Sequence, residues 1–296
     1  MKTDENVSVS TPAGTLRPYL QLLKPRVSSL VVVTTAAGFY LASGTPVDSW
    51  GLVCTVLATA LLAGGSVCLN QVLERNEDAR MHRTAGRPLP AGRVSVLSAT
   101  VYGLSLIVAG TLVLAFMLSL SPAILGLTSS LIYLLAYTPL KRQTPLCTTV
   151  GALPGAIPPL IGWTAAGGEL TVKAWILFGI LFLWQYPHFL AIAWIHREDY
   201  RRAGFKMLPL VDASGRRTAG QIVLFTLLLA CFSILPWNLE LAGNVYLGVA
   251  VGLSLGFLAA TLSLLITPTQ AYAGYVMRAS VLYLPFLLGV LVVDRV

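Results

Sequence analysis

Charged residues leave eight long gaps in this chain of 296 residues, and these gaps constrain the fold more than any motif does. Uncharged runs cover residues 27–47, 49–73, 94–140, 143–168, 174–195, 218–239, 241–277 and 279–293. A helix needs about 20 mainly apolar residues to cross a bilayer. Breaking the longer runs at prolines and polar clusters predicts about nine transmembrane helices, near 27–43, 50–69, 94–118, 121–138, 145–163, 172–195, 218–237, 244–266 and 278–294. We therefore expect an all-α polytopic membrane protein with a single integral membrane domain over residues 1–296.

The basic residues determine the expected orientation. With the N-terminus inside, 18 of the 20 Lys and Arg residues fall in inner segments, which leaves Lys173 and Arg295 outside. This asymmetry follows the positive-inside rule, and it explains the net charge of +8 without nucleic acid as a partner. Residues 1–16 lack a signal-peptide core, so we expect a flexible cytoplasmic tail. The expected location is the bacterial inner (plasma) membrane, crossed many times, with the N-terminus in the cytoplasm.

Two inner loops, 70–93 and 196–217, hold 11 of the 20 basic and six of the 12 acidic residues. They follow the expected second and sixth helices with a similar order of acids, arginines and turn, which is the weak internal symmetry of a duplicated membrane fold. The positive-inside rule explains why arginines are abundant in these loops. It does not explain Asn70, Glu74 and Asp78, which recur at intervals of four residues and so share one helical face, because each step turns by only about 40°. Glu77 points elsewhere.

An amide and two carboxylates on one face form a cluster of hard oxygen ligands. Mg²⁺ prefers such ligands and leaves part of its shell to water and substrate phosphate. Groups that suit phosphate oxygens stand nearby in the sequence, on Arg83, Arg87, Lys141 and Arg142. The second loop contributes one corresponding acid, Asp199. We therefore predict a Mg²⁺–diphosphate site at the membrane boundary whose ligands and catalytic residues are Asn70, Glu74, Asp78 and Asp199. An isoprenyl diphosphate would fit, with its tail in an apolar chamber, since neutralising the head promotes ionisation of the allylic C–O bond.

These residues belong to strings that resemble the UbiA superfamily of intramembrane prenyltransferases, whose first motif is Asn-x-x-x-Asp-x-x-x-Asp. Within it the chain is most similar to the protohaem IX farnesyltransferases, or haem O synthases. The matching strings run from about residue 24 to 212 and are NQVLERNEDARMHRT, GRPLP, YTPLKR, GAIPPLIGW, WQYPHFLAIAW and DYRRAGFKMLP. Two positions depart from the superfamily pattern. Glu74 replaces the middle aspartate, and Ala203 stands where the second motif usually has another aspartate, so the number of bound metals stays open.

The resemblance implies a ring of nine helices and a reaction. A farnesyl group passes from farnesyl diphosphate to a vinyl group of haem B, with Mg²⁺ as cofactor, and water addition gives the hydroxyethylfarnesyl haem, haem O, for terminal oxidase assembly. The expected partners are farnesyl diphosphate, haem B and the lipid bilayer. Haem A synthase and oxidase assembly factors are further candidates.

His188 is the one histidine inside an expected span. It is either a satisfied polar core group or, as we predict from the resemblance, the residue that binds haem iron. Candidate contacts of propionate or phosphate are Arg201, Arg202 and Lys206, although topology explains them nearly as well. His82 and His196 lie among loop arginines, and their role stays open.

The expected span 145–163 is rich in residues that interrupt helices, namely Pro154, Pro158, Pro159, Gly151, Gly155 and Gly162. This pattern indicates either a broken helix that lines a cavity or ordinary close packing through small residues. Several aromatic residues are likewise either walls of an isoprenyl chamber or interfacial anchors; these are Tyr137, Tyr186, Trp184 and Trp194.

Three other functions compete with this interpretation. Another UbiA-type prenyltransferase would act on a quinone precursor, a chlorophyll-like acceptor or a lipid, although WQYPHF and AGFKMLP favour haem. A membrane transporter would also show internal symmetry and broken helices, but its ionisable residues usually lie near the midplane, and the acids here avoid the spans. A haem-binding scaffold would not need the acidic triad.

Overall fold

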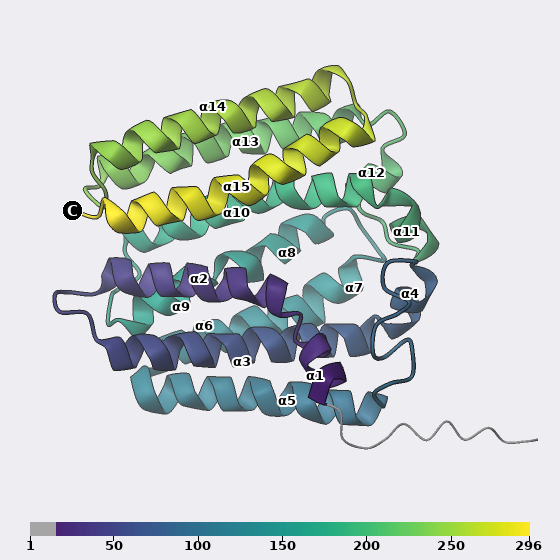
Figure 1. Ribbon diagram of the computed structural model, residues 1–296, viewed down its shortest axis with the longest axis horizontal. Coiled ribbons are helices and arrows are strands. Elements are labelled where there is room, and N and C mark those ends of the chain that lie inside the picture. The colour runs from purple at the N-terminus through teal and green to yellow at the C-terminus, as the bar shows by residue number, and fades with distance from the viewer. Residues whose placement is uncertain (1–15) are drawn as a thin grey trace, which may run out of the picture.

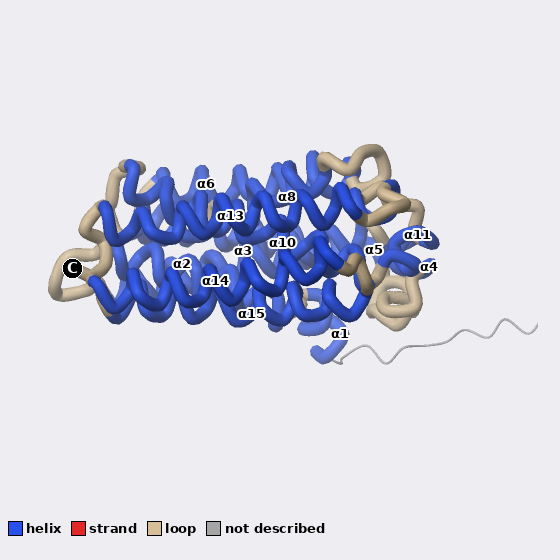
Figure 2. The backbone as a smooth tube through the Cα atoms, turned by 90° about the horizontal axis from the view of Figure 1, so that it is seen from above, coloured by secondary structure: helices blue, strands red, loops and turns tan. Residues whose placement is uncertain are grey.

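The computed structural model describes residues 16–296, and their secondary structure is almost entirely helical (Figure 1). The tail expected over residues 1–16 lies outside the described residues, apart from Leu16, which begins α1 (Leu16–Leu22). The long helices run side by side along the longest axis of the molecule, and the connecting loops gather at its two ends (Figure 2).

Eight helices within residues 16–296 are long and apolar enough to cross a membrane, and they confirm eight of the nine expected spans. Two of them include π-helical stretches, η1 and η2. In chain order they are α2 (Pro25–Ala42), α3 (Ser49–Leu73), α5 (Val96–Val113) with η1 (Leu114–Leu118), α6 (Leu120–Leu131) with η2 (Ile132–Tyr137) and α7 (Thr138–Leu140), α10 (Val172–Ile195), α13 (Arg216–Asn238), α14 (Asn244–Ile266) and α15 (Gln270–Val293). The last helix begins earlier than expected because Arg278 is exposed on its surface and stacks over the Tyr275 ring rather than ending the helix.

The ninth expected span is a pair of shorter helices, α8 (Cys147–Ala156) and α9 (Pro158–Ala165). The chain breaks at Ile157 because Pro158 and Pro159 have no N–H to donate to the preceding turn. The carbonyl of Pro154, which loses its donor in this way, accepts a hydrogen bond from the Ser129 hydroxyl of α6 at 3.0 Å. The broken helix is therefore observed, and its free carbonyl is satisfied by a neighbouring helix.

Close packing through small residues is observed in the same segment. A Cβ on Gly162 would overlap the carbonyl oxygen of Thr35, and a Cβ on Gly38 would overlap the carbonyl of Pro159. These two glycines let α9 and α2 approach closely, as small residues do in membrane helix interfaces. Both interpretations of this span are therefore correct: the helix is broken, and small residues pack it closely against α2.

The buried core consists of two main parts. The larger apolar cluster lies among α10, α13, α14 and α15, and the second lies among α3, α5, α6 and α9. Short helices at one end carry the two charged loops: α4 (Arg75–Arg80) follows α3, while α11 (Arg197–Arg202) and α12 (Leu208–Val211) follow α10 (Figure 1). The backbone N–H of His82 donates to Asp199 Oδ1 at 3.2 Å. The two loops therefore meet at one end of the molecule, opposite the C-terminus.

Candidate active site

The first predicted motif forms one buried face at the junction of α3 and α4. Asn70 lies in the last turn of α3, Glu74 occupies the junction, and Asp78 lies in α4; they are 2%, 4% and 1% exposed. Backbone bonds from Glu74 N to Asn70 O (2.9 Å) and from Asp78 N to Glu74 O (2.8 Å) continue the helical pattern across the junction. The four-residue spacing therefore aligns the three side chains as expected.

Cationic side chains neutralise both carboxylates of this motif. Lys141 Nζ lies 2.7 Å from Glu74 Oε1, and Arg87 Nη1 lies 2.7 Å from both oxygens of Asp78. Burial disfavours the charge on Lys141, but the neighbouring carboxylate of Glu74 and its hydrogen bond outweigh burial and raise the pKa of Lys141 above its usual value. Asn70 donates its side-chain N–H to Thr138 Oγ1 at 3.0 Å, which ties the motif to α7.

Arg142 is held on another side of the junction. Its Nη2 lies 2.8 Å from Glu77 Oε2 and donates to the carbonyl of Leu73 at 3.2 Å. Glu77 does point away from the triad, as the helical geometry indicated. The neighbours Lys141 and Arg142 thus grip the α3–α4 junction from two sides.

The second loop brings Asp199 beside the first. Arg202 donates to Asp199 Oδ1 at 2.6 Å. Burial opposes the charge of Asp199, but Arg202 and the backbone N–H groups of His82 and Arg83 outweigh burial and hold its pKa below the usual value. Burial, aided by the positive charge of Arg83, lowers the pKa of His196. His82 thus contacts the second motif, and His196 directly precedes the helix that carries it.

The remaining basic candidates of the loops have neighbours of their own. Arg83 donates to the Tyr200 hydroxyl at 3.3 Å, and exposed Arg201 pairs with Glu198 at 2.7 Å. The backbone N–H of Lys206 donates to the carbonyl of Lys141 at 2.7 Å. That bond joins the second loop to the segment that carries Lys141, the partner of Glu74.

Lys24 is a further cation near this cluster that the sequence analysis did not single out. It precedes α2 in the left-handed conformation (φ 43°). Burial, aided by the positive charge of Arg87, lowers the pKa of Lys24 to about 7, against the opposing influence of Asp78 and Glu74. The available signal was its position directly before Pro25, where the family resemblance begins. Its neighbours were not evident because they lie far along the chain.

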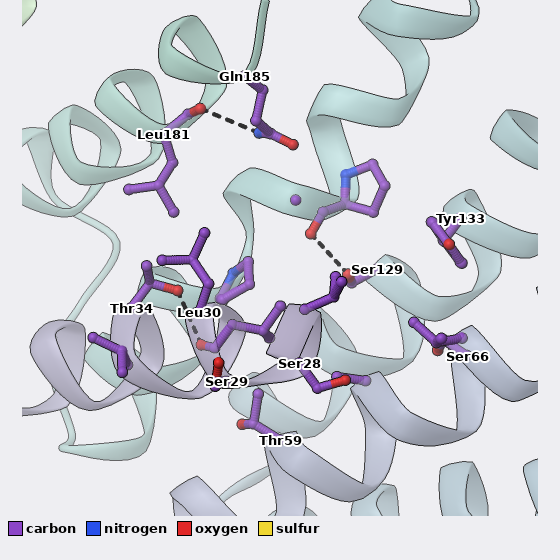
Figure 3. A pocket seen from close by; sticks show the side chains of 18 of the residues that line it. Ser28, Ser29, Leu30, Thr34, Thr59, Ser66, Ser129, Tyr133, Leu181 and Gln185 are labelled. Carbon is purple, nitrogen blue, oxygen red and sulfur yellow. Dashed lines mark hydrogen bonds between the residues drawn. The ribbon is translucent and has the colours of Figure 1, made fainter. Parts of the chain in front are cut away.

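A cavity of about 730 Å³ lies within the bundle (Figure 3). It lies among α2, α3, α6 with η2, α8, α9, α10 and α15. Tyr133 and Tyr137 line it, and Lys141 Nζ lies 4.6 Å from the centre of the Tyr137 ring. That ring therefore separates the polar end of the site from the chamber. Most of the lining is apolar, with scattered hydroxyl groups such as those of Thr59 and Ser66 visible in Figure 3.

Two of the four singled-out aromatic residues, Tyr137 and Trp184, line this cavity, and so does His188. Tyr186 stacks on Phe225 beside a separate cavity of about 130 Å³. Trp194 is buried but does not line either of these cavities. Aromatic character alone did not distinguish the two groups, because the side of the helix decides between them.

The donor chemistry of the first motif fits a hard cation, with one amide and two carboxylates from Asn70, Glu74 and Asp78. Asp199 would add a third carboxylate from the second loop, which meets the first loop at the backbone N–H of His82. Glu74 Oε1 is buried and accepts no hydrogen bond from the described residues, although Lys141 lies close. Within residues 16–296 no three His, Cys, Asp or Glu side chains are grouped as a metal site. The carboxylates are neutralised by side-chain cations instead.

The sequence pattern of the UbiA prenyltransferase family matches residues 31–286. The chain belongs to the UbiA prenyltransferase family. It is 43% identical over 291 residues to the protoheme IX farnesyltransferase of Solibacter usitatus, covering 95% of this chain and 99% of that relative. It is 45% identical over 276 residues to the protoheme IX farnesyltransferase of Salinibacter ruber, covering 93% and 98%.

Solved structures of UbiA proteins share the fold. Digeranylgeranylglyceryl phosphate synthase superposes with a TM-score of 0.79 at 19% identity, covering 94% of this chain and 98% of that one. A UbiA homologue from Archaeoglobus fulgidus bound to GPP and Mg²⁺ gives 0.67 at 17% identity, covering 93% and 99%. The resemblance found in the motifs is thereby confirmed, and the UbiA chain is a prenyltransferase rather than a transporter.

Proposed function

We propose that this prenyltransferase transfers a farnesyl group from farnesyl diphosphate to a vinyl group of haem B, and that water then adds to give haem O. One observation carries the proposal: buried carboxylates paired with cations lie beside Tyr137, which lines an apolar cavity of about 730 Å³ whose wall also includes His188. The cluster suits a diphosphate head, and the cavity suits a hydrocarbon tail and a flat acceptor. The relatives named protoheme IX farnesyltransferase support this acceptor.

Asn70, Glu74, Asp78 and Asp199 would hold Mg²⁺, which would neutralise the diphosphate and favour its departure. The Archaeoglobus fulgidus homologue was solved with GPP and Mg²⁺ bound, which supports a metal-dependent reaction on this fold. Arg83, Arg87 and Lys141 would bind the phosphate oxygens directly. Arg142, which we predicted for the same role, already grips Glu77, so we assign it the positioning of Lys141 and the α3–α4 junction.

The residues at the head of the cavity would guide the bond changes. The allylic C–O bond breaks, and the diphosphate leaves with both electrons beside Lys141. The aromatic faces of Tyr133 and Tyr137 would stabilise the allylic cation. The π electrons of the vinyl group then form the new C–C bond, and the resulting cation lies next to the porphyrin ring. Water supplies an oxygen to this carbon and releases its proton to solvent at the charged end of the site.

His188 would bind the iron of haem B from the cavity wall. Arg201, Arg202 and Lys206 would contact propionate or phosphate groups, which requires Arg201 and Arg202 to exchange their present partners, Glu198 and Asp199. We assign the charged end to the cytoplasmic side of a bacterial inner membrane, since it carries most of the basic residues. Haem A synthase and oxidase assembly factors would receive the product.

Mass spectrometry of haem tests the proposal directly. Membranes that contain the protein are incubated with haem B, farnesyl diphosphate and Mg²⁺, and haem is extracted. We expect a haem heavier by one farnesyl group and one hydroxyl group, and no such product when farnesyl diphosphate is omitted. An unchanged haem, together with prenylation of an added quinone precursor or lipid acceptor, would show that the acceptor is wrong.

A further inference from the structure

His188 is held in place by two residues that line up beside it. Its Nδ1 lies 2.7 Å from Ser280 Oγ of α15. Its ring stacks on that of Trp184, one turn earlier in α10, with centroids 4.6 Å apart and planes inclined by 17°. The indole N–H of Trp184 donates to the backbone carbonyl of Ser280 at 2.8 Å. Ser280 therefore anchors both the imidazole and the ring that stacks on it.

The Ser280 hydroxyl favours one tautomer of His188. Its oxygen lies 2.7 Å from the carbonyl of Met277, an acceptor only, and 2.7 Å from Nδ1 of His188. With the hydroxyl hydrogen directed to that carbonyl, Nδ1 carries the imidazole hydrogen and Nε2 keeps its lone pair. A neutral imidazole in this form is a metal ligand, and such histidines nearly always donate their other N–H to an oxygen acceptor.

The surroundings of His188 offer its Nε2 few polar partners. His188 lines the cavity, where its neighbours include the uncharged Phe189, Val281 and Leu284. Ser280 and Trp184 are 0% and 4% exposed, so water does not compete for the contacts that orient the ring. An apolar wall with one directed nitrogen suits a flat, apolar ligand that has a metal ion at its centre.

We propose that Ser280, together with Trp184, is a positioning unit that directs Nε2 of His188 toward the iron of the porphyrin acceptor. The inference rests on the proposed function and deepens it. A bond from Nε2 to the iron would set the plane of the macrocycle, so fixing the imidazole would also fix the tilt of the porphyrin in the cavity. Ser280 thus acts through His188 and does not touch the reacting atoms.

Haem B titration of the purified full-length protein tests this role by visible absorption and electron paramagnetic resonance. Loss of the oxygen that orients a metal-bound histidine typically weakens metal affinity by about 10–100-fold. We expect Ser280→Ala to weaken haem binding within that range and to broaden the ligand-field signal, because the tautomer is no longer fixed. Ser280→Thr, which keeps the hydroxyl, should restore both. The matched control is Ser254→Ala, because Ser254 is a buried serine that contacts Tyr283 away from His188.

The outcomes separate the inference from the function beneath it. Wild-type affinity and spectrum in Ser280→Ala, combined with their loss in His188→Ala, would overturn the role of Ser280 alone. An unchanged spectrum in His188→Ala would overturn iron binding by His188 and the inference with it. Failure of the wild-type protein to farnesylate haem would count against the proposed function itself. If Ser280→Ala does not fold, Ser280→Cys replaces it, and its weaker acceptor should give an intermediate affinity.

Discussion

Glu74 and Asp78 are buried carboxylates whose charges are neutralised by Lys141 and Arg87. Removing one partner of a buried pair leaves an uncompensated charge, which typically costs about 3–5 kcal/mol. The same pairs also prepare the site for a ligand, because a metal ion can take over the carboxylates while the cations turn to phosphate oxygens. These carboxylates and cations can therefore bind a metal ion and a diphosphate without leaving any of their charges unneutralised.

Replacing Asp78 should separate catalysis from folding. We expect Asp78→Asn and Asp78→Ala to reduce product formation at least 100-fold, roughly 2.7 kcal/mol of transition-state stabilisation, while the protein still inserts and purifies as a folded chain. The measurement is haem product by mass spectrometry alongside thermal unfolding. Exposed Glu198 provides the control, and Glu198→Gln should keep most of the activity. Substantial turnover by Asp78→Ala would refute the metal-ligand assignment.

Chelation should remove activity without unfolding the protein. EDTA is expected to abolish farnesyl transfer, and added Mg²⁺ should restore it. The midpoint of thermal unfolding should stay nearly constant, because Lys141 and Arg87 neutralise the carboxylates when no metal is bound. Full activity in EDTA would contradict a metal-dependent mechanism.

The face of Tyr137 should matter more than its hydroxyl. A cation near an aromatic face gains about 1–2 kcal/mol when water is excluded, so Tyr137→Leu should slow the reaction roughly 10-fold, and Tyr137→Phe should remain close to the wild type. Initial rates with saturating substrates measure the effect. The exposed Tyr275 gives a matched control, since Tyr275→Leu lies outside the chamber lining. Equal losses for Phe and Leu at position 137 would assign the effect to the hydroxyl instead.

The helices α8 and α9 show how one broken element shapes the chamber. Pro158 ends the hydrogen-bonding pattern of α8, Ser129 satisfies the free carbonyl of Pro154, and Pro154, Gly155 and Pro158 line the cavity. In a continuous helix the carbonyl of Pro154 would instead accept a backbone hydrogen bond from the following turn. The close approach of α9 to α2 compensates for the packing that the break removes.

A methyl group at the α2–α9 contact should be costly. Gly162→Ala would push a Cβ into the carbonyl of Thr35, and overpacking of this kind typically costs about 1–3 kcal/mol. We expect a lower midpoint of thermal unfolding and a smaller yield of folded protein. Gly248→Ala in α14 meets open space and serves as the control, because it should leave stability unchanged or slightly improved. Equal midpoints for the two variants would show that α2 and α9 are not closely packed in the membrane.

The whole molecule brings together two loops that are separated by more than a hundred residues of sequence. The bond between His82 and Asp199 closes the charged end, while Arg295 at the other end donates to the carbonyls of Tyr40 and Ser43 and ties the C-terminus to α2. One end of the bundle is therefore built for polar ligands, and the other is closed by backbone contacts.

Labelling from one side of the membrane tests this polarity. Single cysteines at Gly86 and Arg201 should react with a membrane-impermeant maleimide from the cytoplasmic side, and a cysteine at Gly44 should react only from the opposite side. Cys231 is replaced by serine in this experiment because the other three native cysteines are buried. Accessibility of Gly86 and Arg201 from opposite sides would rule out a shared site.

Local patterns predicted much of this protein. Hydropathy located eight spans and the region of the ninth, because a bilayer requires each crossing segment to satisfy its own backbone. The spacing of Asn70, Glu74 and Asp78 predicted a shared face, because helical geometry extends only a few residues along the chain. Pro158 likewise predicted the break, because a proline has no N–H to donate to the preceding turn.

Side-chain partners across the bundle were decided only by packing. Nothing near Arg142 in the sequence indicates that it pairs with Glu77, and Ser280 lies too far from His188 in the sequence for any pattern to connect them. The sequence likewise did not distinguish Lys24 from the other basic residues, because its neighbours at the charged end are brought close only by the folding of the chain. The physical reason is that periodicity determines which side of a helix a residue occupies, whereas the neighbour on that side depends on how separate helices pack together.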